Sequence, residues 1–382
     1  MENKKRLVWI DALKFSACLF VFWGHFFEVF LHKINDFTLI GQYTVDALMK
    51  SVINGNFWVS VFCIISGFIC YSSMLSERGR CIDYISYCLK RYIRFVIPLI
   101  LILCVIIGLK ETAGFNTNNY EYLLNGTWGG YYSESDFSFI NCLKFVLLFQ
   151  DNLDGPIWML RPLILSNYFI VLTNCLVQHR TVNLKIVWIS ITCLATVLTI
   201  VVNITSCDGL KYLYCLDSCL TGACIRCFCS EIKTIKCRFI SVVGCLFVFI
   251  MLAGLHDFLF VNLLGIDVFK LKLYSIWNIL YGAIFFAVLY TGFKDYRTRN
   301  ETLSKLAKIS FFVFLLHWPI MCSIGPLVMN MTRSENYNIR VLAIFVVVNV
   351  LVIALSFVLD AINTLISVYI ADMNHRKLVF RT

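Results

Sequence analysis

The sequence predicts an all-α, polytopic membrane protein, a bundle of about ten transmembrane helices. Of its 382 residues, 59% are hydrophobic, and the mean hydropathy is +0.78. Soluble domains do not combine such an apolar content with repeated runs of about 20 apolar residues that contain few charges. We expect a single transmembrane domain over residues 1–382, with no separate soluble domain.

Ten apolar runs predict the helices in order. The first, residues 7–31, is too long for a signal-peptide core and has no small-residue cleavage site, so we expect it to be retained. The last, residues 339–369, is longer than one crossing needs and should tilt or extend into water. The apolar stretch 137–150 is too short to span and is expected to be interfacial or partly buried. The other predicted spans are 54–75, 93–110, 156–177, 185–204, 212–229, 239–259, 273–292 and 308–330.

Lysine and arginine residues indicate the orientation. The net charge is +10, and the basic residues cluster in alternate short segments between the apolar runs, as in cytoplasmic loops. This distribution argues against nucleic acid as a partner. The intervening loops contain few basic residues, and the largest, residues 111–155, carries six acidic ones. Both termini are therefore predicted to be cytoplasmic, and the protein is expected to cross the cell membrane (an inner or plasma membrane) several times.

The 18 cysteines do not form the pattern of a disulfide framework or a metal site. Most lie within apolar runs, where cysteine behaves as a small hydrophobic residue. The densest group lies between Cys215 and Cys229, but no second pair or histidine cluster follows at a metal-site interval. We expect no bound metal.

Two ionisable residues stand out within the first apolar run. Lys14 and His25 are eleven residues apart, close to three helical turns, and so share a helix face about 16 Å apart. Asp11 lies one turn before Lys14, near the same face. Ionisable groups are costly in hydrocarbon and usually face the bundle interior or a water-filled cavity. The structural alternatives are that Lys14 pairs with Asp11 or reaches the cytoplasmic surface, and that His25 is a packing residue.

A pair of arginines precedes the third span. Arg91 and Arg94, in KRYIRFVIP, are one turn apart and can present charge-assisted donors to phosphate. Together with Lys14 they suggest a cytoplasmic anionic ligand whose tail extends up the bundle towards His25. Coenzyme A has this shape, with phosphates at one end and a thioester at the end of a long pantetheine arm. The alternative is that both arginines only anchor the helix at the membrane surface.

Five segments together resemble the acyltransferase-3 family of integral membrane O-acyltransferases. IDALKFSACLFVFWGH matches its Lys or Arg, ten residues, His pattern, and FWVSVFCIISGFI matches a segment that ends in Ser-Gly-Phe. RYIRFVIP matches Arg-x-x-Arg with a following proline, GPIWML a tryptophan motif, and ISFFVFLLHWPI a late Ser and Leu-His-x-Pro motif. The matching positions are Lys14, His25, Ser66, Gly67, Phe68, Arg91, Arg94, Pro98, Trp158, Ser310, His317 and Pro319.

The resemblance implies a ten-helix core that uses cytoplasmic acyl-CoA, usually acetyl-CoA. It implies a sugar hydroxyl as acceptor, on a surface glycan or a lipid-linked precursor. It also implies that His25 is the essential catalytic residue, and that Lys14, Arg91 and Arg94 bind the donor. We assign Ser66 to the same donor set.

The chain departs from the family on the acceptor side. Many members carry a glutamate five residues after the fourth-helix tryptophan, where this chain has Leu163. Arg161 lies nearby, and it could reach the membrane surface, pair with Glu28 or bind the acceptor. Glu28 could instead orient His25.

Further candidates for the acceptor side are Asp154 and Trp158, because carboxylates and aromatic faces suit sugar hydroxyls. Asp11 and His317 are candidates for the lining of a reaction chamber. His317 could equally make a structural hydrogen bond.

The sequence therefore predicts a membrane O-acetyltransferase that modifies carbohydrate, with acetyl-CoA as co-substrate and no bound cofactor. His25 could remove the acceptor proton as a general base or carry the acyl group as an acyl-imidazole. The partners would be acetyl-CoA, a carbohydrate acceptor and membrane lipids. The main alternative is a transporter or flippase in which Lys14, His25 and Arg161 form a binding or proton-relay site. An inactive relative that serves as an assembly partner is a third reading.

Overall fold

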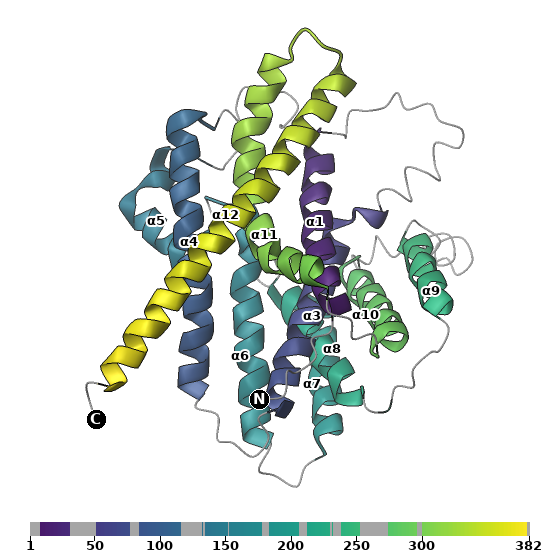
Figure 1. Ribbon diagram of the computed structural model, residues 1–382. Helices are drawn as coiled ribbons and strands as arrows, with labels where there is room; N and C mark the ends of the chain where they lie inside the picture. The colour runs from purple at the N-terminus through teal and green to yellow at the C-terminus, as the bar shows by residue number, and fades with distance from the viewer. Residues whose placement is uncertain are drawn as a thin grey trace. The chain divides into compact units, whose positions relative to one another are not determined.

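The computed structural model confirms the all-α, polytopic class (Figure 1). It describes residues 8–30, 51–76, 84–115, 132, 134–151, 153–177, 183–205, 212–229, 231, 238–252, 274–295 and 300–379. These residues form helices and connecting turns, with no strand among them. Eight helices are long and apolar enough to cross a membrane, and they coincide with eight of the ten predicted spans.

The other two predicted spans are shorter helices in the described part of the chain. Helix α8 covers Tyr212–Phe228 with 17 residues, and α9 covers Arg238–Ile250 with 13. Residues 253–259, the end of the second of these predicted spans, lie outside the described residues. The total of ten spans therefore stays a prediction. The stretch predicted to be too short to span forms only η2 (Glu134–Phe137) and α5 (Phe139–Val146).

The chain forms two compact units, and each is discontinuous in sequence. Unit 1 comprises Met1–Gly24, Ile34–Leu89 and Met159–Ser304, and unit 2 comprises His25–Lys33, Lys90–Trp158 and Lys305–Thr382. The residues of α1 (Val8–Phe30) and α4 (Tyr84–Thr112) are divided between the two units. Neither unit is a contiguous N- or C-terminal domain.

Unit 1 is organised around a single helix, α3. This helix packs against α6, α8 and α10, while α7 packs against α8 and α9 against α10. Helix α3 covers Gly55–Ser76, α6 covers Leu160–Val177, α7 covers Leu184–Thr205 and α10 covers Tyr274–Phe293.

Two glycines explain how closely α3 approaches α8. A Cβ added to Gly67 would overlap the carbonyl oxygen of Cys219, and one added to Gly222 would overlap the carbonyl oxygen of Ile64. Each helix therefore places a glycine against the backbone of the other. Small residues at such positions allow membrane helices to gain close van der Waals contact, which drives their association in lipid.

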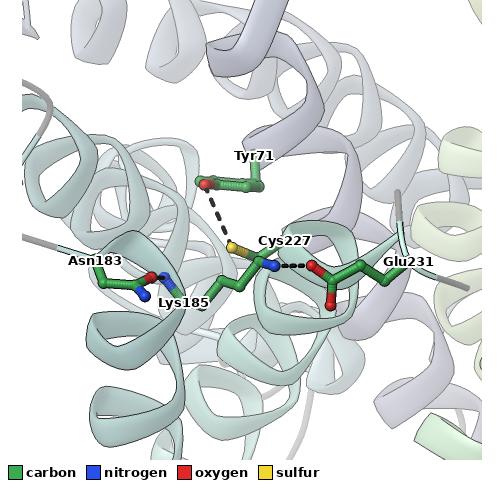
Figure 2. Close-up of polar contacts among 5 residues, drawn as sticks. All are labelled: Tyr71, Asn183, Lys185, Cys227 and Glu231. Atoms are coloured by element: carbon green, nitrogen blue, oxygen red, sulfur yellow. Dashed lines mark hydrogen bonds and ion pairs between the residues drawn. The ribbon is translucent and has the colours of Figure 1, made fainter.

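Polar contacts hold the start of α7 and the end of α8 in place (Figure 2). The start of α7 follows a basic loop, and the end of α8 precedes another. Lys185, near the start of α7, forms an ion pair with Glu231, just beyond α8. The side-chain oxygen of Asn183 accepts a hydrogen bond from the backbone N–H of Lys185, 3.0 Å away. The hydroxyl of Tyr71, on α3, donates to the Cys227 sulfur at 3.9 Å. These contacts place the start of α7 beside the end of α8, as in an antiparallel pair.

Unit 2 is built on a long hairpin of α11 (Glu301–Met331) and α12 (Tyr337–Val379), joined by a short turn (Figure 1). Helix α11 is mostly buried and contains Pro319 and Pro326. The hydroxyl of Tyr337 donates to the carbonyl of Phe30, and a terminal guanidinium nitrogen of Arg340 donates to the carbonyl of Met329 at 3.1 Å. The first bond ties the hairpin to the end of α1, and the second joins α12 to the end of α11 across the turn.

The lengths and surfaces of the unit 2 helices agree with a bilayer environment. Helix α12 has 43 residues, so it is about 65 Å long, roughly twice the thickness of a hydrocarbon core. This length confirms the prediction that the last helix exceeds one crossing. Its Leu342, Val350 and Leu365 are 62%, 60% and 70% exposed. Such apolar side chains without protein cover are expected to face lipid.

Candidate functional site

The candidate site lies within unit 2, where the end of α1 meets the middle of α11. The imidazole rings of His25 and His317 are parallel, with centroids 5.5 Å apart and 11° between their planes. The indole of Trp318 approaches His25 edge to face, with centroids 5.6 Å apart. Two histidines far apart in sequence are therefore brought into direct contact.

The tautomer of His317 follows from its hydrogen bond. This residue is fully buried, and its Nδ1 lies 2.6 Å from the carbonyl oxygen of Phe314 one turn earlier. A carbonyl can only accept, so Nδ1 carries the hydrogen. In the neutral ring, Nε2 is then the nitrogen with the lone pair. The sequence left open a structural bond or a place in the chamber, and the geometry gives this residue both a structural bond and contact with His25.

His25 has an acid nearby on its own helix. The carboxylate of Glu28 lies 3.7 Å from Nδ1 of His25, which is too long for a hydrogen bond but within ion-pair range once the ring is protonated. The His25 side chain is 21% exposed and that of Glu28 58% exposed. Solvent reaches the pair, so the interaction is partly screened.

Asp154 is a buried carboxyl group in the same unit, between α5 and η3 (Gly155–Met159). Its N–H donates to the carbonyl of Asp151, 3.0 Å away, and its carbonyl accepts from Ile157 at 3.1 Å. Neither carboxyl oxygen has a hydrogen-bond partner among the described residues. Burial, and then the charge of Asp151, raise the pKa of Asp154 well above 3.8. Both effects favour the neutral acid.

The other acceptor-side candidates lie where η3 leads into α6. Trp158 and Arg161 are both half-buried, and Leu163, at the position of the family glutamate, is buried. Trp158 belongs to unit 2 and Arg161 to unit 1. The proposed pair of Arg161 with Glu28 would join the two units, so it stays a prediction.

The two arginines of the donor motif lie within α4. This helix begins at Tyr84, nine residues before the predicted span, because the segment ahead of the arginines is also helical. Arg91 is half-buried and Arg94 is exposed. Their spacing of three residues within one helix puts them on the same face. Arg94 is thus largely uncovered by protein.

The remaining donor candidates belong to unit 1. Lys14 is half-buried on α1, and Asp11 is buried one turn earlier. The hydroxyl oxygen of Ser66 accepts a hydrogen bond from the side-chain amide of Asn167 at 3.3 Å, which joins α3 to α6. Asn167 is itself fully buried and also donates to the carbonyl of Leu163. Ser66 therefore has a packing role whatever its part in donor binding.

The sequence did not single out two of these contacts. Trp318 directly follows His317 in the late motif, so its position was available as a signal, but its approach to His25 depends on tertiary packing. Asn167 carried no signal of its own, because an isolated asparagine in an apolar helix does not reveal its partner.

Comparison with known proteins gives one match. A family model described as an acyltransferase domain matches residues 7–361, which include every candidate residue discussed above. No curated protein and no solved structure matches the chain.

Proposed function

This chain belongs to the acyltransferase-3 family, and we propose that it is a membrane O-acetyltransferase that uses cytoplasmic acetyl-CoA to acetylate a carbohydrate hydroxyl. The acceptor would be a cell-surface glycan or its lipid-linked precursor. The family assignment supports acyl transfer, and the apolar helices support a multi-pass membrane protein. The observation that carries the chemistry is the contact between His25 and His317.

In the first route, His25 acts as a general base. Its unprotonated nitrogen takes the proton of the acceptor hydroxyl while the hydroxyl oxygen attacks the thioester carbonyl. The C–S bond then breaks, and the thiolate of coenzyme A receives the proton. Glu28 lies within ion-pair range of the imidazolium that forms in between. His317 keeps His25 in place through ring stacking.

In the second route, His25 acts as a nucleophile. Its unprotonated nitrogen attacks the thioester carbonyl and the C–S bond breaks. The departing thiolate of coenzyme A takes the N–H proton of the acylated ring, and an acyl-imidazole remains. The acceptor hydroxyl then attacks this intermediate, and its proton needs a base other than His25. His317, whose ring stacks on His25 and carries a lone pair on Nε2, is the candidate for that role. The two routes differ in whether acyl-His25 accumulates with donor alone.

The residues proposed for the donor side and those proposed for the acceptor side differ in chemistry. Arg91 and Arg94 share a helix face and would bind the phosphates of the donor, with Lys14 on the inner part of α1. On the acceptor side, Asp154 as a neutral acid could donate one hydrogen bond and accept others, as a sugar hydroxyl requires. Trp158 offers an aromatic face, and Arg161 further donors.

The proposal is tested by incubating purified protein in lipid nanodiscs with radiolabelled acetyl-CoA and membranes, and identifying what becomes labelled. We expect label in a carbohydrate fraction with wild type and His375→Gln, and none with His25→Ala. His375 is the matched control because it lies near the end of α12, far along the chain from the proposed site. Movement of a polar or lipid-linked solute without any transfer of label would support the transporter alternative instead.

A further inference from the structure

The segment between α4 and α6 does not stay at the outer end of α4 but runs inward along that helix. At the predicted outer end, the ammonium group of Lys110 lies 4.3 Å from the ring centroid of Phe137. Further along the segment, the hydroxyl of Tyr92 donates to the carbonyl of Leu147, 2.9 Å away. Lys110 and Tyr92 are about 27 Å apart along α4, so residues 137–147 run antiparallel to it (Figure 1).

The inner end of this segment is a turn that lies beside the donor motif. Leu148 has a φ of 60°, in the left-handed region, which is unusual for a bulky side chain. Its N–H donates to the carbonyl of Phe145 at 3.0 Å, which closes the last turn of α5. Tyr92, which holds the turn, lies between Arg91 and Arg94 in the Arg-x-x-Arg motif. Strained backbone of this kind is concentrated at ligand sites.

The residues after this turn carry buried polar atoms without partners. Oε1 of Gln150 is buried and has no hydrogen-bond partner among the described residues, although the side chain as a whole is only half-buried. The carboxyl oxygens of Asp154 are in the same condition. Irregular backbone at membrane depth occurs only where it is covered by protein or lines a water-filled cavity. A buried polar atom in such a place is normally satisfied by a ligand or an ordered water.

The arm of the donor is the ligand that the proposed function brings to this turn. With the phosphates at Arg91 and Arg94, the pantetheine arm, which contains amide groups, would pass the neighbouring turn. A glutamine side chain pairs with an amide because it offers both N–H donors and a carbonyl acceptor. We propose that Gln150 binds an amide of the pantetheine arm, with Oε1 accepting its N–H, and that Tyr92 positions the turn before Gln150. This inference rests on the proposed use of acyl-CoA.

The test measures the affinity of two probes by calorimetry, with full-length protein in nanodiscs. Desulfo-coenzyme A carries the arm without the thiol, and phospho-ADP is the nucleotide end of coenzyme A without the arm. Gln150→Met keeps the length of the side chain but removes the amide, and Tyr92→Phe removes only the hydroxyl that holds the turn. Asn141→Leu is the matched control, because the amide of Asn141 in α5 already donates to the carbonyl of Ser135 at 2.8 Å.

We expect Gln150→Met to lower the affinity for desulfo-coenzyme A by about three- to tenfold, as for the loss of one hydrogen bond, and to leave phospho-ADP unaffected. Tyr92→Phe should cause a smaller loss with the same selectivity, and Asn141→Leu should leave both affinities unchanged. Without ligand, Gln150→Met should melt no lower than the wild type, because the lost oxygen has no partner among the described residues. A glutamine with only a packing role would instead lower the melting temperature and spare the affinity for desulfo-coenzyme A.

The outcomes separate this inference from the proposed function. If the wild type binds desulfo-coenzyme A and Gln150→Met binds it equally well, Gln150 has no part in donor binding and the use of acyl-CoA stands. An unchanged donor affinity with a raised acceptor KM would likewise overturn the inference and assign the amide to the acceptor. A wild type that binds neither probe would contradict the proposed function, and this inference with it. If Gln150→Met does not fold, Tyr92→Phe decides, and an unchanged affinity for desulfo-coenzyme A there would overturn the inference.

Discussion

The rings of His25 and His317 lie parallel, 5.5 Å apart, one at the end of α1 and the other in the middle of α11. Because His317 donates from Nδ1 to the Phe314 carbonyl, both of its ring nitrogens have a defined state when the ring is neutral. Two protonated imidazoles at this distance would repel each other, most strongly where little water screens them. The protonation of either ring therefore affects the other, and the two histidines should be tested as a pair.

Replacing His317 by asparagine separates its structural role from its chemical one. The asparagine N–H can still donate to the Phe314 carbonyl, but the side chain carries no base. We expect His317→Asn to lower the turnover number by about tenfold or more, as for loss of a general base, with little change in donor affinity. The measurement is steady-state acetyl transfer across a range of pH. Turnover equal to that of the wild type, with an unaltered pH profile, would leave His317 as a packing residue.

The Arg-x-x-Arg motif predicts a change in donor binding. The double variant Arg91→Ala with Arg94→Ala should lower the affinity for coenzyme A by about tenfold or more, because phosphate contacts are lost. Lysine at both positions should restore only part of the affinity, since an ammonium lacks the bidentate fork. Calorimetry with desulfo-coenzyme A measures this without turnover. Arg333→Ala, an exposed arginine in the turn before α12, serves as the control. Equal affinity in the double variant and the wild type would leave the motif as a topology signal.

The sequence predicted the helices better than it predicted their contacts. A membrane span depends on local composition, so runs such as those of α1, α4 and α11 could be recognised without knowledge of their neighbours. The start of α4 was placed too late because the basic segment before the hydrocarbon is also helical. The contact of His25 with His317 could not be read from the motifs. Each motif marks its own helix, whereas the pairing depends on packing between helices.

The glycines of α3 and α8 give a prediction about stability. Gly67→Ala should lower the stability of unit 1 by about 1–3 kcal/mol, the usual range for overpacking. The new methyl group meets a backbone carbonyl that cannot rotate away. Gly222→Ala should act in the same way. Gly108→Ala in α4 is the matched control, since an added Cβ there meets nothing within 4 Å. Thermal melts in one detergent compare the three. Equal melting temperatures would contradict the close approach of α3 to α8.

The role of Arg161, two residues before the position at which the family glutamate is missing, can be tested by a double-mutant cycle. If Arg161 pairs with Glu28, Arg161→Gln removes the partner of a largely exposed carboxylate and should lower the free energy of unfolding by no more than about 1 kcal/mol. Adding Glu28→Gln should then restore stability. If Arg161 binds the acceptor, the single change should raise the acceptor KM while donor affinity and the melting temperature stay constant. Normal stability together with normal kinetics would contradict both roles.

The last prediction concerns the buried carboxyl group of Asp154. Its pKa is raised in the folded protein by burial and by Asp151, so above pH 3.8 the folded state holds a proton that the unfolded state has lost. The wild type therefore loses stability as pH rises from about 3.8 towards the raised pKa. Asparagine resembles the neutral acid and does not titrate, so Asp154→Asn removes this loss.

We expect the melting temperatures of wild type and Asp154→Asn to be close near pH 4 and to diverge as pH rises, with the variant the more stable. Glu335→Gln, at an exposed glutamate, should show no such divergence. In transfer assays, Asp154→Asn should keep an acceptor KM near that of the wild type. Asp154→Leu should raise this KM, because leucine offers no hydrogen bond to a sugar hydroxyl. A wild type that gains stability relative to Asp154→Asn with rising pH would show that Asp154 is ionised and paired, and would remove it from the acceptor site as a neutral donor.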